Sequence, residues 1–168
     1  MGEASVIALA FDYPSPGSLQ RLEGEVRGLP VGGVRSELER FVSAVAGLSQ
    51  GEWEELHTRT LDLSPLFVPY VGHVIWGENY RRGEFMADLK GAMREAGVDT
   101  GGELPDHLAP ILRYVDVVDA PLADLVEVLA KAVHDMSKEL KKAEPANPYR
   151  YLLAGARHLA DEFEGATV

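Results

Sequence analysis

The stretch LADLVEVLAKAVHDM, residues 122–136, repeats its apolar side chains with the period of an α-helix. Six of them share one face of a helix with 3.6 residues per turn: Leu122, Leu125, Val126, Leu129, Val133 and Met136. An exposed apolar stripe of this length favours aggregation, so other helices are expected to cover it. The stretch therefore predicts a helix packed against further helices.

The same periodicity extends outward along the chain. Apolar stripes of this kind occupy residues 34–48, 104–118 and 149–163. Convincing alternation with the period of two that a half-buried strand requires is absent. A chain of 168 residues has the length of one domain. We therefore expect an all-α protein in which residues 1–168 form a single bundle of about eight helices.

Several residues mark where these helices should begin and end. Ser49 and Glu52 have the spacing of a capping box, in which each side chain bonds the other residue's backbone N–H. The pairs Ser15-Pro16 and Ser64-Pro65 predict an N-cap followed by proline at the first helical position. A helix that begins near Asn79 is expected to stop at Gly97.

Composition excludes several classes of function. The chain has 27 acidic and 16 basic residues and a formal net charge of −11, so phosphate backbones and anionic membranes repel it, whereas a cationic partner is attracted. It has no cysteine, which removes disulfides and thiolate metal sites. The apolar stretch Val6 to Phe11 is too short for a signal peptide or a membrane span. We expect a cytoplasmic protein.

Motifs for catalysis are sparse. Neither a Gly-x-Ser-x-Gly nucleophile elbow nor a glycine-rich phosphate loop occurs, so we expect no enzymatic activity and no cofactor. Glu54 and His57 form a single Glu-x-x-His pair, whereas a di-iron bundle uses two such pairs. The alternative that stays open is a small metal-dependent helical enzyme that uses Glu54, His57, Glu103 and His107.

Two stretches stand out from the regular helical pattern. The first runs from His57 to Tyr70 and contains Pro65 and Pro69, which are incompatible with an uninterrupted helix. The second, residues 103–108 (ELPDHL), is a junction between a loop and a helix that concentrates two carboxylates and an imidazole. Between them, Arg81-Arg82 lies in mid-chain, where we interpret it as a solvated helix start and not as a twin-arginine export signal.

These stretches carry a resemblance to a known family. Leu61-Asp62-Leu63-Ser64-Pro65, then Arg81-Arg82-Gly83, then residues 103–110 (ELPDHLAP) are similar to motifs of the NarJ/TorD/DmsD family of molybdoenzyme assembly chaperones. Asn147-Pro148-Tyr149 resembles the start of that family's last helix. The resemblance spans roughly residues 55 to 155, and its closest branch serves nitrate reductases and related type II dimethyl-sulfoxide-reductase-family enzymes.

The resemblance implies a function that composition alone does not give. Members of this family bind the N-terminal segment, often a twin-arginine signal, of a molybdopterin-containing catalytic subunit, as in nitrate assimilation. They hold this unfolded segment until the molybdenum cofactor is inserted, and they do not belong to the finished enzyme. The resemblance thus predicts a cytoplasmic chaperone for redox enzyme maturation, expected as a monomer, with a dimer formed by helix exchange at residues 98–103 left open.

The resemblance and the chemistry of a cationic, apolar peptide together indicate which residues bind it. The expected polar contacts come from Glu103, Asp106 and His107, with Asp62 as a further carboxylate and Pro105 within the motif. Phe67, Tyr70 and Trp76 are expected to line an apolar groove, for which ordinary core packing is the alternative. A structural adaptor that stays in its complex is a further alternative to a chaperone that dissociates.

Overall fold

The protein, seen here as a computed structural model, is described over residues 1–166, and this range contains nine α-helices and no β-strand. The prediction of an all-α fold with about eight helices is confirmed. The helices are α1 (Glu3–Phe11), α2 (Ser18–Arg27), α3 (Gly33–Ala46), α4 (Gln50–Leu61), α5 (Val71–Trp76), α6 (Tyr80–Ala96), α7 (Leu108–Val117), α8 (Ala123–Ala143) and α9 (Tyr149–Ala166).

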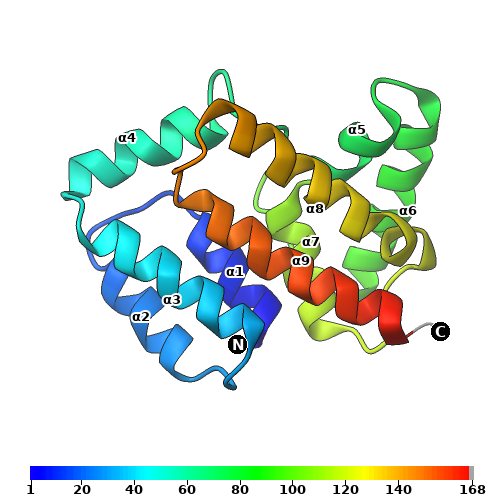
Figure 1. Ribbon diagram of the computed structural model, residues 1–168. Helices are drawn as coiled ribbons and strands as arrows, with labels where there is room; N and C mark the ends of the chain where they lie inside the picture. Colours follow the sequence, from blue (N-terminus) through cyan, green and yellow to red (C-terminus); the bar gives the residue numbers. More distant parts are fainter. Residues whose placement is uncertain (167–168) are drawn as a thin grey trace.

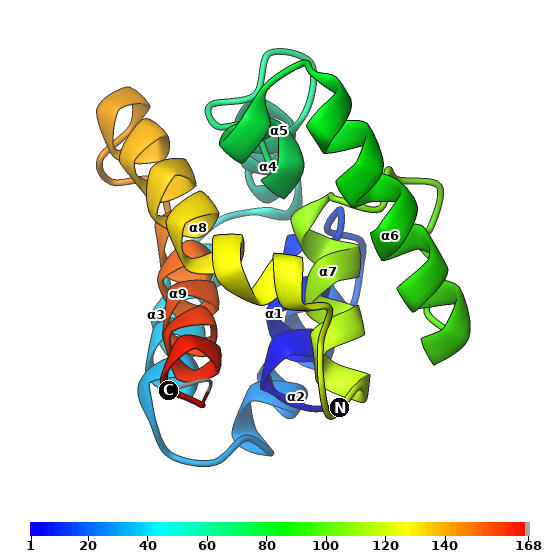
Figure 2. The same cartoon turned by 90° about the vertical axis from the view of Figure 1, so that its right-hand side faces the viewer.

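The helices surround one apolar core. α9 packs against α3 on one side and α8 on the other, while α1 packs against α7 (Figures 1 and 2). The largest side chains that are fully buried there are Phe41, Phe85 and Tyr149. Burial of apolar area is the main force that holds such a bundle together. None of the helices within residues 1–166 is both long and apolar enough to cross a bilayer.

Three of the predicted helix boundaries are confirmed by their capping contacts. The Glu52 backbone N–H donates to Ser49 Oγ at 3.1 Å, and the Ser49 backbone N–H donates to Glu52 Oε1 at 2.9 Å, which is a complete capping box at the start of α4. Asn79 caps α6, and Gly97 ends it with a φ of 72° in the left-handed region that suits glycine.

Three other expected boundaries are wrong. α2 begins at Ser18, after Gly17, and not at Ser15-Pro16. Residues 62–70 contain no helix, so Ser64-Pro65 does not start a helix and α5 begins only at Val71. Leu104 belongs to no helix and is 48% exposed, because α7 begins at Leu108. A proline disfavours helical geometry in the residue before it, and Pro65, Pro69 and Pro105 all interrupt these segments.

Candidate functional site

The two irregular stretches meet in space. Residues 69–71 and 106–108 form a short antiparallel bridge centred on Tyr70 and His107. The Val71 N–H donates to the Asp106 carbonyl at 2.8 Å, and the Leu108 N–H donates to the Pro69 carbonyl at 2.9 Å. Backbone groups that lack helical partners are therefore satisfied by the other stretch. The bridge fixes the loop before α7 against the segment that enters α5.

A buried ion pair anchors this bridge. The Asp106 side chain has no exposed surface, and the Arg82 guanidinium donates to it through Nε at 2.9 Å and through Nη2 at 3.3 Å. The bond to Asp106 raises the pKa of Arg82 above its usual value. Gly72 leaves room for the pair, because a Cβ there would lie 2.7 Å from Asp106 Oδ2.

This pair corrects two expectations from the sequence. Arg82 is not solvated, since only 13% of its side chain is exposed, whereas 42% of the Arg81 side chain is. Asp106 does not offer a free carboxylate to a peptide, because its two oxygens face Arg82 inside the protein. Asp106 instead holds the segment that presents its neighbours Glu103 and His107.

Tyr70 supports the exposed end of that segment. Its hydroxyl donates to Glu103 Oε2 at 2.8 Å, and its ring meets the His107 ring edge-on with centroids 5.2 Å apart. Burial, followed by the bond to Glu103, raises the pKa of Tyr70 to about 12. The Arg82 guanidinium carbon lies 5.7 Å from the Tyr70 ring centroid. The exposed Glu103 side chain is therefore held in place by the half-buried Tyr70.

His107 joins the loop to α7. Its Nδ1 accepts the Ala109 backbone N–H at 3.1 Å, which makes His107 the N-cap of the helix and assigns the ring proton of the neutral form to Nε2. Burial lowers the pKa of His107 below its usual value. The side chain is thus expected to be neutral at neutral pH, with its Nε2–H available as a donor.

A polar cleft of about 560 Å³ opens in front of His107 and Glu103. Its walls are the end of α1, the last turn of α4, the loop before α7 and the first turns of α7. Four carboxylates and one arginine line it: Asp12, Asp62, Asp99, Glu103 and Arg113. Burial raises the pKa of Asp12, an effect that Arg113 opposes. The excess of carboxylates gives the cleft a negative charge, which suits a cation.

His57 lies in the wall of this cleft. Its Nε2 lies 3.0 Å from the Phe11 carbonyl, to which it donates in the tautomer that carries the proton there. Its Nδ1 is buried and has no hydrogen-bond partner among the described residues. Burial lowers the pKa of His57. The ring is therefore held as a neutral group between α1 and α4.

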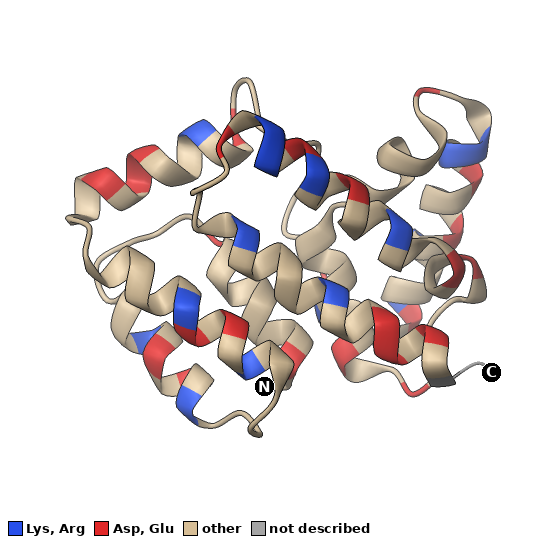
Figure 3. Cartoon of the chain, in the orientation of Figure 1, with Lys and Arg blue, Asp and Glu red and all other residues tan. Residues whose placement is uncertain are grey.

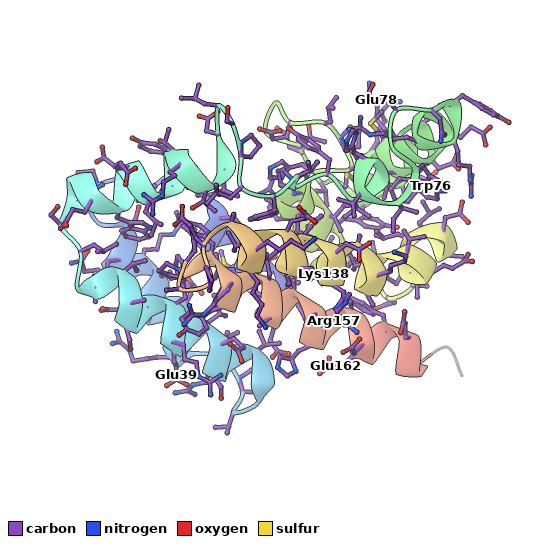
Figure 4. The ribbon with its side chains drawn as sticks, turned by 45° about the horizontal axis from the view of Figure 1, so that its top comes forward. Glu39, Trp76, Glu78, Lys138, Arg157 and Glu162 are labelled. Atoms are coloured by element: carbon purple, nitrogen blue, oxygen red, sulfur yellow. The ribbon has the colours of Figure 1, made fainter. Side chains whose placement is uncertain are left out.

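The predicted site residues fall into three groups. Asp62, Glu103 and His107 line the cleft, while Tyr70 and Asp106 support its wall. The remaining three lie outside its lining: Phe67 is 2% exposed and belongs to the core, Pro105 lies in the turn before the bridge, and Trp76 packs on Phe85 at the end of α5, where Figure 4 labels it beside Glu78.

Sequence reasoning missed the contribution of the first helix. Asp12 and Tyr13 follow the end of α1 and line the cleft opposite Glu103 and His107, and Arg113 projects from α7. The signal in the sequence was a polar Asp-Tyr-Pro directly after an apolar stretch. Its distance of about ninety residues from the loop before α7 hid the contact, because only folding brings these segments together.

The residues of the metal-enzyme alternative are divided between two places. His57, Glu103 and His107 line the cleft, but Glu54 accepts hydrogen bonds from Tyr13 Oη at 3.3 Å and Gln50 Nε2 at 2.9 Å in a neighbouring cavity. Within residues 1–166, no three or more His, Asp or Glu side chains are grouped as metal ligands would be. The geometry gives this alternative no support.

Fold and site together define a class: an all-helical protein with an acidic cleft walled by segments from three distant parts of the chain. No family model matches the sequence, and no curated protein matches it with significant similarity.

Proposed function

We propose that this protein is a cytoplasmic assembly chaperone of the NarJ/TorD/DmsD type that catalyses no reaction. Its client is the catalytic, molybdopterin-containing subunit of a nitrate-reductase-like or other type II dimethyl-sulfoxide-reductase-family enzyme. The chaperone binds the N-terminal, twin-arginine-type segment of that subunit, assists insertion of the molybdenum cofactor, and leaves before export or membrane docking. One observation carries the proposal: two of the stretches on which the family resemblance rests, residues 61–65 and 103–110, meet at a single acidic cleft, and Arg82 of a third stretch bonds Asp106 in the wall of that cleft.

The charge of the cleft suits such a ligand. Asp62 and Glu103 are exposed at its edge, and a guanidinium forms strong, charge-assisted hydrogen bonds with carboxylates. The overall net charge of −11 attracts a cationic segment from a distance. Long-range attraction therefore guides the peptide toward the protein, and the carboxylates of the cleft bind it.

Titration calorimetry with a synthetic peptide tests the proposal. The peptide copies the N-terminal segment, including its arginine pair, of a nitrate-reductase-like catalytic subunit. We expect it to bind, and we expect the double variant Asp62→Asn/Glu103→Gln to bind it about tenfold more weakly or worse, as the loss of charge-assisted bonds requires. Added salt should weaken the binding, because it screens exposed charges.

The matched control is Asp88→Asn/Glu95→Gln, which removes the same charge from exposed positions of α6 that lie outside the cleft. This variant should bind the peptide as the wild type does. Equal losses in the two double variants would mean that only net charge matters, and the cleft would not be the site. Absence of binding by the wild type would contradict the proposed function itself.

A further inference from the structure

A second cavity of about 700 Å³ adjoins the acidic cleft. Tyr13 and Asp62 line both cavities, so the two are neighbours at these residues. We call the second cavity the α4 groove. Its walls are the outer face of α4, with Glu54 and Arg59, the Tyr13 side chain, and the loop that follows α4, with Asp62, Leu63 and Leu66. The loop projects from the body of the molecule in Figure 1.

Leu63, in this loop, has an unfavourable conformation. Its φ is 52°, and it is the only residue other than glycine with a positive φ in residues 1–166. The left-handed conformation is unfavourable for a residue with a Cβ, because the Cβ comes too close to the following carbonyl oxygen. The Leu63 side chain is 88% exposed, so packing in the free protein does not offset that cost. Strain of this kind concentrates at functional sites.

The local contacts keep Leu63 in this position. Its backbone N–H donates to Asp62 Oδ1 at 2.9 Å, and the Leu66 N–H donates to the Thr60 carbonyl at 2.9 Å, which closes the loop over the end of α4. Leu66 and Tyr13 add further apolar surface to the groove, and 56% of Tyr13 is exposed. The groove therefore presents apolar side chains to solvent next to a cleft that suits cations.

Arg59, the basic residue that lines the groove, is paired with carboxylates along its edge. Arg59 donates through Nε to Glu144 Oε2 at 2.8 Å and also pairs with Glu55, which directs its charge toward the end of α8. Glu54 accepts the Tyr13 hydroxyl. Figure 3 shows the acidic residues along α4 in red and one basic residue near its end. Because Arg59 is paired in this way, its charge does little to repel a basic ligand from the groove.

We propose that the α4 groove binds the apolar part of the same peptide whose basic residues bind in the cleft. The inference rests on the proposed function and deepens it, because it assigns the ligand two parts: arginine or lysine for the cleft, and a leucine-sized or larger apolar side chain for Leu63, Leu66 and Tyr13. A volume of about 700 Å³ lies in the range of sites that hold ligands of several chemical groups. Because the cavities share Tyr13 and Asp62, a few residues of extended chain, each about 3.3 Å long, connect the two parts.

The proposal is tested with two peptides and three proteins. One peptide carries both the arginine pair and the apolar residues that follow it, and the second replaces those apolar residues by serine at unchanged charge. The key variant is Leu63→Asn. Asparagine tolerates the left-handed conformation better than leucine, so the variant should unfold at the same temperature as the wild type or a higher one. The control is Val31→Asn, which changes a residue that is 93% exposed between α2 and α3.

We expect Leu63→Asn to weaken binding of the first peptide by about five- to tenfold, as loss of part of a buried leucine contact does. It should leave the affinity for the serine peptide unchanged, and Val31→Asn should change neither affinity. Two outcomes would contradict the role of the groove and leave the proposed function in place. The wild type could bind both peptides equally, or Leu63→Asn could bind both as the wild type does. Wild-type protein that binds neither peptide overturns both. A lowered unfolding temperature in Leu63→Asn would assign Leu63 to the fold.

Discussion

Asp106 is a carboxylate without exposed surface, and such a group needs a cation and hydrogen bonds to stay charged inside a protein. Arg82 supplies both, with two of its nitrogens facing the two carboxylate oxygens. Removal of one partner from a buried pair leaves the other without compensation, which is much more harmful than loss of a surface pair. The two neighbouring arginines of α6 should therefore respond very differently to the same substitution.

We expect Arg82→Gln to lower the free energy of unfolding by about 3–5 kcal/mol. Arg81→Gln should lower it by about 1 kcal/mol or less, because the ion pairs of Arg81, at 3.5 Å to Glu84 and 3.6 Å to Asp124, are exposed. Urea-induced unfolding followed by circular dichroism measures both values. Similar losses in the two variants would show that the Asp106 pair does not anchor the bridge.

His57 makes stability depend on pH. Burial lowers its pKa from the usual 6.5, so the folded protein takes up this proton less readily than the unfolded chain. The stability that depends on neutral His57 is therefore complete above pH 6.5 and is lost as the pH falls from there through the lower pKa of the folded state. The physical cause is burial, and a proton on the buried Nδ1 would in addition find no acceptor among the described residues.

We expect the free energy of unfolding of His57→Gln to fall less than that of the wild type between neutral pH and about pH 5. The variant and the wild type are compared at each pH, because Asp12 has the opposite effect. Burial raises the pKa of Asp12, so its contribution to the free energy of unfolding increases as the pH falls. His134→Gln, at an exposed position of α8, should follow the wild-type curve. Parallel curves for the wild type and His57→Gln would contradict the assignment.

At the scale of the elements, α5 and α6 approach closely because Gly72 has no side chain. A Cβ at Gly72 would lie 3.0 Å from Arg82 Cγ and 3.2 Å from Phe85 Cδ2, in addition to its contact with Asp106. In contrast, Gly91 within α6 has no atom within 4 Å of its would-be Cβ. One glycine is thus required by packing, and the other only weakens its helix.

We expect Gly72→Ala to destabilise the protein by about 1–3 kcal/mol, as overpacking of a filled site does. Gly91→Ala should stabilise it by roughly 0.5–1 kcal/mol, because alanine favours a helix over glycine. Thermal unfolding of both variants beside the wild type measures the difference in sign. If Gly72→Ala also gained stability, the close approach of α5 to the ion pair would be wrong.

The regular helices were predictable from the sequence, because a local property determines each of them. The stripe from Leu122 to Met136 begins at the N-cap of α8 and continues along that helix, and the contacts of Ser49 and Asn79 mark helix starts that their residue types had indicated. The segment from residue 62 to 70 was not predictable in the same way. Its conformation depends on the bridge to residues 106–108, and a pairing between distant segments leaves no periodic signal.

At the scale of the whole molecule, the sequence predicted the right segments for the site but not the role of each residue. Asp106 and His107 are adjacent in the motif, yet one is buried against Arg82 and the other borders the cleft. A polar residue of either type can hold the fold together or face a ligand, and its burial decides between these two roles. Asp12 and Tyr13 were missed for a related reason, since they reach the cleft only when α1 packs against α7.

The bridge between residues 69–71 and 106–108 also limits how any ligand is recognised here. Many peptide-binding proteins add the ligand as an extra strand, so that main-chain hydrogen bonds supply affinity for almost any sequence. At this bridge the N–H groups of Val71 and Leu108 and the carbonyls of Pro69 and Asp106 already bond one another. A peptide beside it could not bond these four main-chain groups, so we expect that the proposed ligand is distinguished by its side chains more than by its backbone.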